Sequence, residues 1–132
     1  NLTIINDSKA TSFSSSASTL NCLSNVFWIV GGLAKKGDKF LLSKNDCKNS
    51  KAYIFGKDKF FFIHKLKNVM NYESFADLKT LVQKISKDIN SNKNYSHKII
   101  LFSPAAASFD SFKNFEERGK YFNNLIKKNF NV

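Results

Sequence analysis

Four short apolar runs restrict the possible folds of this chain more than any other feature of its sequence. They occupy positions 2–5, 26–30, 52–55 and 99–102. The runs are continuous and do not alternate between apolar and polar residues, which is typical of strands covered on both faces of a parallel sheet. We therefore predict four buried strands in one open, mostly parallel sheet.

Stretches with helical periodicity lie between these runs. Ser74 to Asp77 resemble a capping box with Asp in place of Glu, and a helix is predicted from there. A second predicted helix starts at Phe112 and runs to a lysine-rich end, and a weaker one covers 16–23. The first helix has its apolar positions three and four residues apart, at Phe75, Leu78, Leu81, Val82, Ile85 and Ile89. Alternating strands and helices predict an α/β domain with helices flanking the sheet.

The charge of the chain favours an anionic partner. The 132 residues suffice for one domain and carry a formal charge of +11. Only Arg118 is arginine, whereas the lysines are spread along the whole chain without a block of five or six. Guanidinium groups supply the bidentate contacts of most nucleic-acid readers, so we favour anionic small ligands over nucleic acid.

The cysteines and the longest apolar run point to a cytoplasmic protein that does not enter the membrane. Cys22 and Cys47 lack metal-ligand spacing and are too few for a disulfide framework, so we expect free thiols. The run 26–34 is far shorter than the roughly 20 residues that span a bilayer. No signal peptide pattern opens the sequence.

Three loops that follow predicted strands carry unusual polar sequences. They read NDSKAT at 6–11, GGLAKKGD at 31–38 and SPAAASFD at 103–110. The carboxyl ends of parallel strands meet at one edge of a sheet, where α/β proteins bind ligands. We therefore expect the three loops to share one site.

The side chains of these loops suit a small molecule with carboxylate groups. Lys9 and Lys35 offer ammonium groups, and Thr11 and Ser108 offer hydroxyls. Asp7 would repel a carboxylate and would instead accept hydrogen bonds from hydroxyls such as those of a ribose.

The small residues and the predicted start of the last helix add to this picture. Gly31, Gly32 and the alanines at 105–107 would let a ligand approach the backbone, and N–H groups near Phe109 and Asp110 would favour an anion. Other readings stay open. The two glycines can simply turn the chain, and Ser108 and Asp110 can be helix N-caps. Phe109, Phe112 and Phe115 fit a core better than a stacking platform.

The segments INDSKAT, GGLAKKGD and LFSPAAASFDSFKNFEERG resemble the C-terminal domain of the MurD family, the D-glutamate-adding Mur ligases of bacterial peptidoglycan synthesis. The resemblance covers 1–132 and implies a Rossmann-like three-layer domain. It also implies that the ATPase and UDP-sugar domains are absent from this chain. A full-length ligase of this kind is cytoplasmic and uses ATP and Mg²⁺, bound mainly by the missing central domain. It joins D-glutamate to UDP-N-acetylmuramoyl-L-alanine, and this part alone should be inactive.

The resemblance also implies roles for individual residues. Asp7 would contact the nucleotide ribose. The residues expected around D-glutamate are Lys9, Thr11, Lys35, Ser108, Phe109 and Phe115. The chain departs from the family pattern at Ser12, where Asn is usual, and at Ala106, where Cys is usual; neither change removes a charge. No catalytic or metal-binding residue is expected in this part, which should be monomeric.

Two other functions are compatible with the sequence. The chain could be a stand-alone basic α/β module that binds RNA or an acidic partner, which steeply salt-dependent RNA binding would reveal. It could also belong to a related ligase that adds another amino acid or acts on folate. The phosphate-binding pattern GxxxxGK[ST] is absent, so the chain would not bind ATP by that route.

Overall fold

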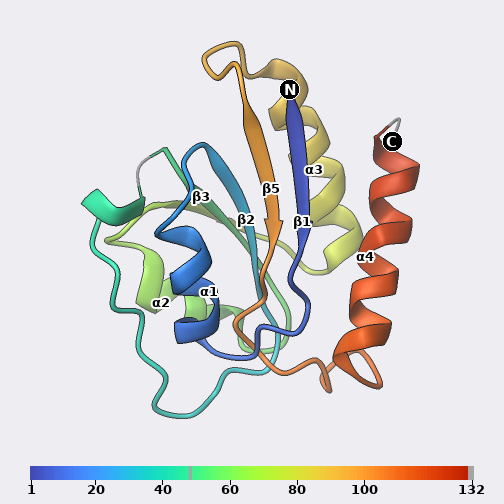
Figure 1. The fold of residues 1–132 in the computed structure, drawn as a ribbon. Helices are drawn as coiled ribbons and strands as arrows, with labels where there is room; N and C mark the ends of the chain where they lie inside the picture. Colours follow the sequence, from blue (N-terminus) through green and yellow to red (C-terminus); the bar gives the residue numbers. More distant parts are fainter. Residues whose placement is uncertain (48, 131–132) are drawn as a thin grey trace.

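A computed structural model describes residues 1–47 and 49–130 (Figure 1). Its five strands are β1 (Leu2–Asn6), β2 (Val26–Gly31), β3 (Lys51–Phe55), β4 (Asn71–Ser74) and β5 (Lys98–Phe102). They form one sheet in the order β1-β5-β2-β3-β4, and every neighbouring pair is parallel. The prediction of an open, mostly parallel α/β sheet is confirmed.

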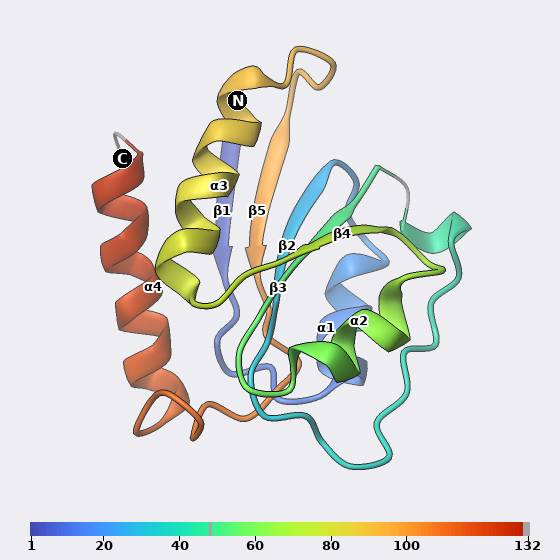
Figure 2. The same cartoon turned by 180° about the vertical axis from the view of Figure 1, so that it is seen from behind.

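Helices cover both faces of this sheet, which gives three layers (Figures 1 and 2). One face carries α1 (Phe13–Leu20) and α2 (Lys59–Leu66), and the other carries α3 (Leu78–Ser91) and α4 (Phe115–Asn129). The residues of β2 alternate between the two cores: Trp28 and Val30 join the first, and Phe27 and Ile29 join the second. All six residues of β2 are buried, which explains why its sequence is apolar throughout.

The predicted capping box at the start of α3 is wrong. Ser74 is the last residue of β4, and Asp77 is the N-cap, with its carboxylate accepting from the Thr80 amide at 2.8 Å. Phe75 precedes the helix, and its amide donates to the Ile54 carbonyl, which prolongs the strand pairing. Ser74 and Phe75 therefore take part in the pairing of β4 with β3, and Ser74 cannot serve as the N-cap of α3.

Other predicted boundaries also need correction. Helix α1 begins at Phe13 with Ser12 as N-cap, so the prediction of 16–23 is too late at both ends. Helix α4 begins at Phe115 with Asn114 as N-cap, three residues after Phe112. Strand β4 and helix α2 were not predicted. The sequence NYES of β4 is polar because it forms an edge strand with three exposed residues.

Candidate functional site

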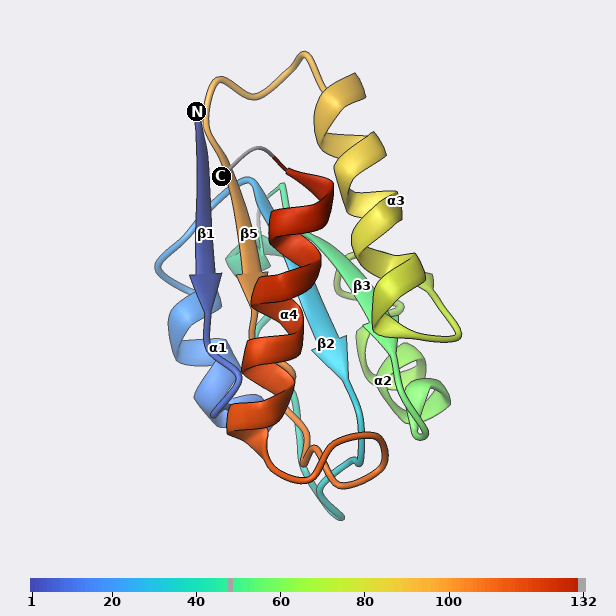
Figure 3. The same ribbon diagram turned by 90° about the vertical axis from the view of Figure 1, so that its right-hand side faces the viewer.

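The three polar loops lie at the carboxyl edge of the sheet, next to one another. They follow β1, β2 and β5, and β5 lies between the other two strands. The loop after β5 leads to α4 on one face, whereas the other two loops lead to elements packed on the opposite face (Figure 3). Such a divergence of connections opens a crevice at the strand ends, where α/β proteins bind ligands. The expectation that the loops share one edge is confirmed.

Backbone hydrogen bonds join the β2 loop to the β5 loop. Leu33 and Ala107 exchange two N–H···O bonds of 3.1 and 3.0 Å, and the Gly31 amide donates to the Pro104 carbonyl at 2.9 Å. A Cβ on Gly31 would lie 1.9 Å from the Phe55 carbonyl oxygen. The glycine thus lets two strands approach each other and does not serve ligand access.

The alanines of the β5 loop also pack inside the protein. Ala105 and Ala106 are fully buried and belong to the core beneath α1 and α2. A Cβ on Gly32 would lie 2.8 Å from the Ala107 carbonyl oxygen. The expectation that Gly31, Gly32, Ala105 and Ala106 admit a ligand is therefore wrong, because these residues let the loops pack against each other. Ala107 is only partly buried.

The buried guanidinium of Arg118 joins the β1 loop to the β5 loop. Arg118 is 1% exposed; it donates to the Ser8 carbonyl, to Ser8 Oγ at 3.1 Å and to the Ala106 carbonyl at 2.8 Å. Ser8 Oγ donates in turn to the Phe115 carbonyl at 2.6 Å. Burial lowers the pKa of Arg118 to about 10, an effect that the charge of Asp110 opposes, so the group stays cationic at neutral pH. A positive charge is thus fixed beneath the loops.

Asp7 is held by a chain of buried hydroxyls. Its amide donates to the Phe102 carbonyl at 2.7 Å, and its Oδ2 accepts from Ser103 Oγ at 2.9 Å. Ser103 Oγ lies 2.6 Å from Ser16 Oγ. Ser16 and Ser103 are both fully buried.

Lys9 and Phe115 line one pocket at this edge. The pocket has a volume of about 310 Å³, and Ser8 and Lys120 contribute to its wall. Phe115 is 42% exposed and Phe109 is 71% exposed, so neither is a core residue, contrary to the expectation. Phe112 packs against the core beneath α4, and its ring centroid lies 5.4 Å from that of Tyr121.

Ser108 is placed differently from the other predicted residues. It is only 3% exposed, and its carbonyl accepts from the amides of Ser111 and Phe112. Its hydroxyl has no hydrogen-bond partner within residues 1–47 and 49–130 and can accept or donate to a ligand. Because α4 begins at Phe115, neither Ser108 nor Asp110 is a helix N-cap, and the amides near Phe109 are not a helix N-terminus.

Thr11 and Lys35 are exposed on adjoining loops. Thr11 directly precedes the N-cap of α1, and the first amide of that helix, on Phe13, donates to Asp38 at 2.7 Å. The Lys35 carbonyl accepts from the Asp38 amide in the same turn. This turn ties the β2 loop to the start of α1. In the described part of the chain, no hydrogen bond or ion pair joins Thr11, Lys35 and Ser108 to one another.

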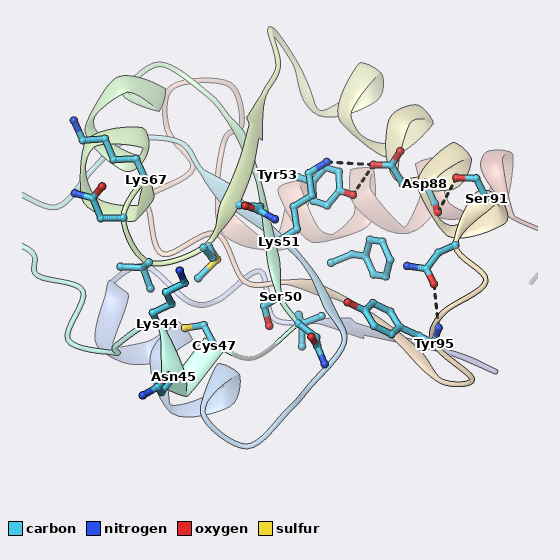
Figure 4. Close-up of a pocket in the computed structure, with 18 residues that line it drawn as sticks. Lys44, Asn45, Cys47, Ser50, Lys51, Tyr53, Lys67, Asp88, Ser91 and Tyr95 are labelled. Atoms are coloured by element: carbon cyan, nitrogen blue, oxygen red, sulfur yellow. Dashed lines mark hydrogen bonds and ion pairs between the residues drawn. The ribbon is translucent and has the colours of Figure 1, made fainter.

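A second groove lies at the opposite, amino edge of the sheet (Figure 4). This groove of about 790 Å³ is lined by the first residues of β2, β3 and β4 and by the end of α3. Asp88, the one carboxylate among the described residues that line it, accepts from Tyr53 at 2.6 Å and pairs with Lys51 and Lys84. Burial acts to raise the pKa of Asp88, but the hydrogen bonds from Lys84 and Tyr53 prevail and lower it. The Asp88 carboxylate therefore joins α3 to β3.

Sequence reasoning missed several residues that build the carboxyl edge. Arg118 falls on the apolar stripe of α4, four residues before Phe122, and a lone arginine in that position was the available signal. The β3–α2 loop also contributes, because the Asp58 carboxylate accepts from the Ala34 amide at 2.8 Å and Asp110 accepts from the Lys57 amide at 3.1 Å. No pattern in the sequence indicated that loop.

The thiols and metal-ligand residues add no second site. Cys22 is exposed and Cys47 is buried, and both are free thiols, as expected. Burial raises the pKa of Cys47 to about 11, which keeps this thiol protonated. Among the described residues, no three His, Cys, Asp or Glu side chains are grouped so as to hold a metal ion. No helix in the same part of the chain is long and apolar enough to cross a membrane.

Comparisons with known proteins point to one class of enzyme. The chain is 35% identical over 128 residues to the UDP-N-acetylmuramoylalanine--D-glutamate ligase of Rickettsia felis. This alignment covers 97% of the chain and 28% of that protein. It is 36% identical over 129 residues to the enzyme of the same name from Francisella philomiragia, covering 95% of the chain and 30% of that protein. The chain thus spans less than a third of the length of these relatives. No protein-family model matches it.

Proposed function

This chain is a homologue of part of the UDP-N-acetylmuramoylalanine--D-glutamate ligases, and on that basis we propose that it is the C-terminal, D-glutamate-binding domain of such an enzyme. The complete enzyme would join D-glutamate to UDP-N-acetylmuramoyl-L-alanine with ATP, in the synthesis of peptidoglycan precursors. This domain would bind the amino acid and contact the ribose of ATP, and by itself it would not turn over substrates.

Each predicted side chain has a task in this proposal. Lys9 and Lys35 would pair with the two carboxylates of D-glutamate, and the hydroxyls of Thr11 and Ser108 would donate to the same oxygens. Phe109 and Phe115 would cover the carbon chain of the ligand. Asp7 would accept hydrogen bonds from the ribose hydroxyls.

The observation that carries the proposal is the joining of the three loops at one edge. Arg118 ties Ser8 to Ala106, and the Leu33–Ala107 bridge ties the β2 loop to the β5 loop. Lysines from two of these loops would therefore face a single ligand. The Ser108 hydroxyl, which has no partner among the described residues, supports the same assignment.

The contribution of this chain to catalysis would be orientation. When ATP is bound to the complete enzyme, it supplies a phosphoryl group that activates the acceptor carboxylate. The residues of this chain would hold the carboxylates of D-glutamate so that its neutral amine faces the activated carbon. Such positioning can lower a barrier by several kcal/mol, up to about 10. The described residues contain no group of three acids, histidines or cysteines that could hold a metal ion, so no residue of this chain is assigned to Mg²⁺.

The proposal is tested by titrating the ¹⁵N-labelled chain with D-glutamate and, separately, with L-glutamate. We expect saturable shifts of the amides in the loops at 7–11, 31–38 and 103–110 with D-glutamate and much weaker shifts with L-glutamate. Removing one charge-assisted hydrogen bond should weaken binding roughly tenfold in Lys35→Gln.

Lys36→Gln provides the matched control, because Lys36 is the neighbouring exposed lysine and has no role in the proposal. Equal weakening in both variants would indicate a general effect of charge and would contradict a specific site. Equal shifts with both enantiomers, or none with either, would overturn the proposed function. Binding of mixed-sequence RNA with a steep salt dependence would favour the alternative of a basic nucleic-acid-binding module.

A further inference from the structure

We infer that Ser103, itself oriented by Ser16, is a positioning residue that fixes the Asp7 carboxylate so that its free oxygen meets the hydroxyls of a ribose. The inference rests on the proposed function, in which Asp7 contacts the ribose of ATP. It assigns a role to two buried serines that lie on α1 and directly after β5.

The direction of the hydrogen bonds follows from the chemistry of the groups. A carboxylate can only accept, so the single proton of the Ser103 hydroxyl goes to Asp7 Oδ2 at 2.9 Å. Ser103 Oγ must then accept from Ser16 Oγ, 2.6 Å away. The Ser103 carbonyl, 3.1 Å from Ser16 Oγ, gives the same proton a second acceptor. The chain of bonds therefore runs in one direction and ends at Asp7.

The backbone of Ser103 is held from both sides. Its amide donates to the Ile29 carbonyl at 3.2 Å, and its carbonyl accepts from the indole Nε1 of Trp28 at 2.8 Å. Trp28 is itself fully buried. Because the side chain of Ser103 is also fully buried and contacts Ser16 Oγ, its hydroxyl has little freedom to turn away from Asp7.

One carboxylate oxygen of Asp7 is left for a ligand. Asp7 is only partly buried, and its Oδ1 accepts no hydrogen bond from any described residue. The bond from Ser103 to Oδ2 restricts rotation of the carboxylate and leaves Oδ1 available to a donor. Vicinal hydroxyls such as those of a ribose are the donors that such an oxygen suits.

The experiment compares ATP with 2′,3′-dideoxy-ATP, which lacks both hydroxyls, as ligands of the 132-residue chain and its variants. Affinities are measured from the shifts of the amides at 7–10. We expect the unmodified chain to bind ATP more tightly than the dideoxy nucleotide. Ser103→Ala should weaken ATP binding about fivefold, the worth of one hydrogen bond, and leave dideoxy-ATP binding unchanged. Ser103→Thr, which keeps the hydroxyl, should restore the preference.

Two further variants separate positioning from a structural effect. Ser18→Ala is the control, because Ser18 is an exposed serine on the same helix as Ser16. The indole N–H of Trp28 donates to the Ser103 backbone carbonyl, which Ser103→Ala retains. The NMR signal of this N–H therefore reports whether the local structure around position 103 stays intact in the variant. If the Trp28 signal shifts to its unfolded position in Ser103→Ala, Ser16→Ala is used in its place. We expect Ser16→Ala to weaken the binding of ATP about twofold and to leave the binding of dideoxy-ATP unchanged.

The outcomes distinguish the inference from its premise. If the unmodified chain does not discriminate between the two nucleotides, the ribose contact of the proposed function fails, and the inference fails with it. If the unmodified chain discriminates and Ser103→Ala discriminates equally well, the positioning role alone is overturned. Equal weakening of both nucleotides by Ser103→Ala would show a structural effect and would also overturn it.

Discussion

At the scale of single residues, Arg118 does most to hold the carboxyl edge together. Its guanidinium satisfies two backbone carbonyls and one hydroxyl from two different loops. In the sequence, Arg118 stands out only as the lone arginine, and the scarcity of arginine disfavours nucleic-acid binding. Its partners could not be predicted, because Ser8 and Ala106 are distant in sequence and meet only through the sheet order.

We expect Arg118→Lys to destabilise the chain by about 2 kcal/mol. A lysine keeps the charge, but its ammonium cannot reach all three acceptors in the fixed directions of a guanidinium. At least one of these buried acceptors would then lack a donor. The measurement is the free energy of unfolding in urea.

Lys120→Gln, a change at an exposed position two residues away, serves as the control and should stay within about 0.5 kcal/mol of the unmodified chain. A loss in Arg118→Lys no larger than in this control would refute the assigned role.

At the scale of helices and strands, the buried elements were easier to predict than the exposed ones. The four apolar runs all became strands. Strands β2, β3 and β5 are buried, as predicted, and burial on both faces requires apolar residues. The prediction that 2–5 is buried is wrong, because β1 lies at one edge of the sheet and has no buried residue. Strand β4 lies at the edge of the sheet, so its residues need not be apolar and its sequence resembles a helix start. The N-terminus of α3 was predicted too early for a related reason. Ser74, the expected N-cap, belongs to β4, so the helix begins after Asp77.

The corrected start of α3 leads to a prediction. Asp77→Ala should cost about 1 kcal/mol of unfolding free energy at neutral pH, whereas Ser74→Ala should cost close to nothing. The hydrogen bond from the Thr80 amide lowers the pKa of Asp77 below its ordinary value. A lowered acid pKa means that this stabilisation is complete above the unfolded-state value, near pH 4, and is lost as the pH falls through the folded-state value.

Urea unfolding of both variants between pH 2 and pH 7, roughly the range over which aspartate titrates, checks this expectation. The difference between Asp77→Ala and the unmodified chain should shrink below about pH 4. A larger cost for Ser74→Ala than for Asp77→Ala would reinstate the original capping box.

At the scale of the whole molecule, the parallel topology and the common edge of the three loops followed from the sequence. What could not be predicted is how the loops are joined. The space beside Gly31 and Gly32 that suggested room for a ligand is occupied by the Phe55 and Ala107 carbonyls, and Ala105 and Ala106 are buried in the core. The groove at the amino edge was also unforeseen, because no sequence motif connects the residues that line it.

The central claim is that the carboxyl edge binds the amino acid, and a crystal structure of this chain with D-glutamate tests it most directly. The account predicts that the ligand lies between the loops at 7–11, 31–38 and 103–110. Lys35 Nζ and Ser108 Oγ should then lie about 3 Å from its carboxylate oxygens. D-glutamate seated in the groove at the amino edge, or away from these three loops, would contradict the account.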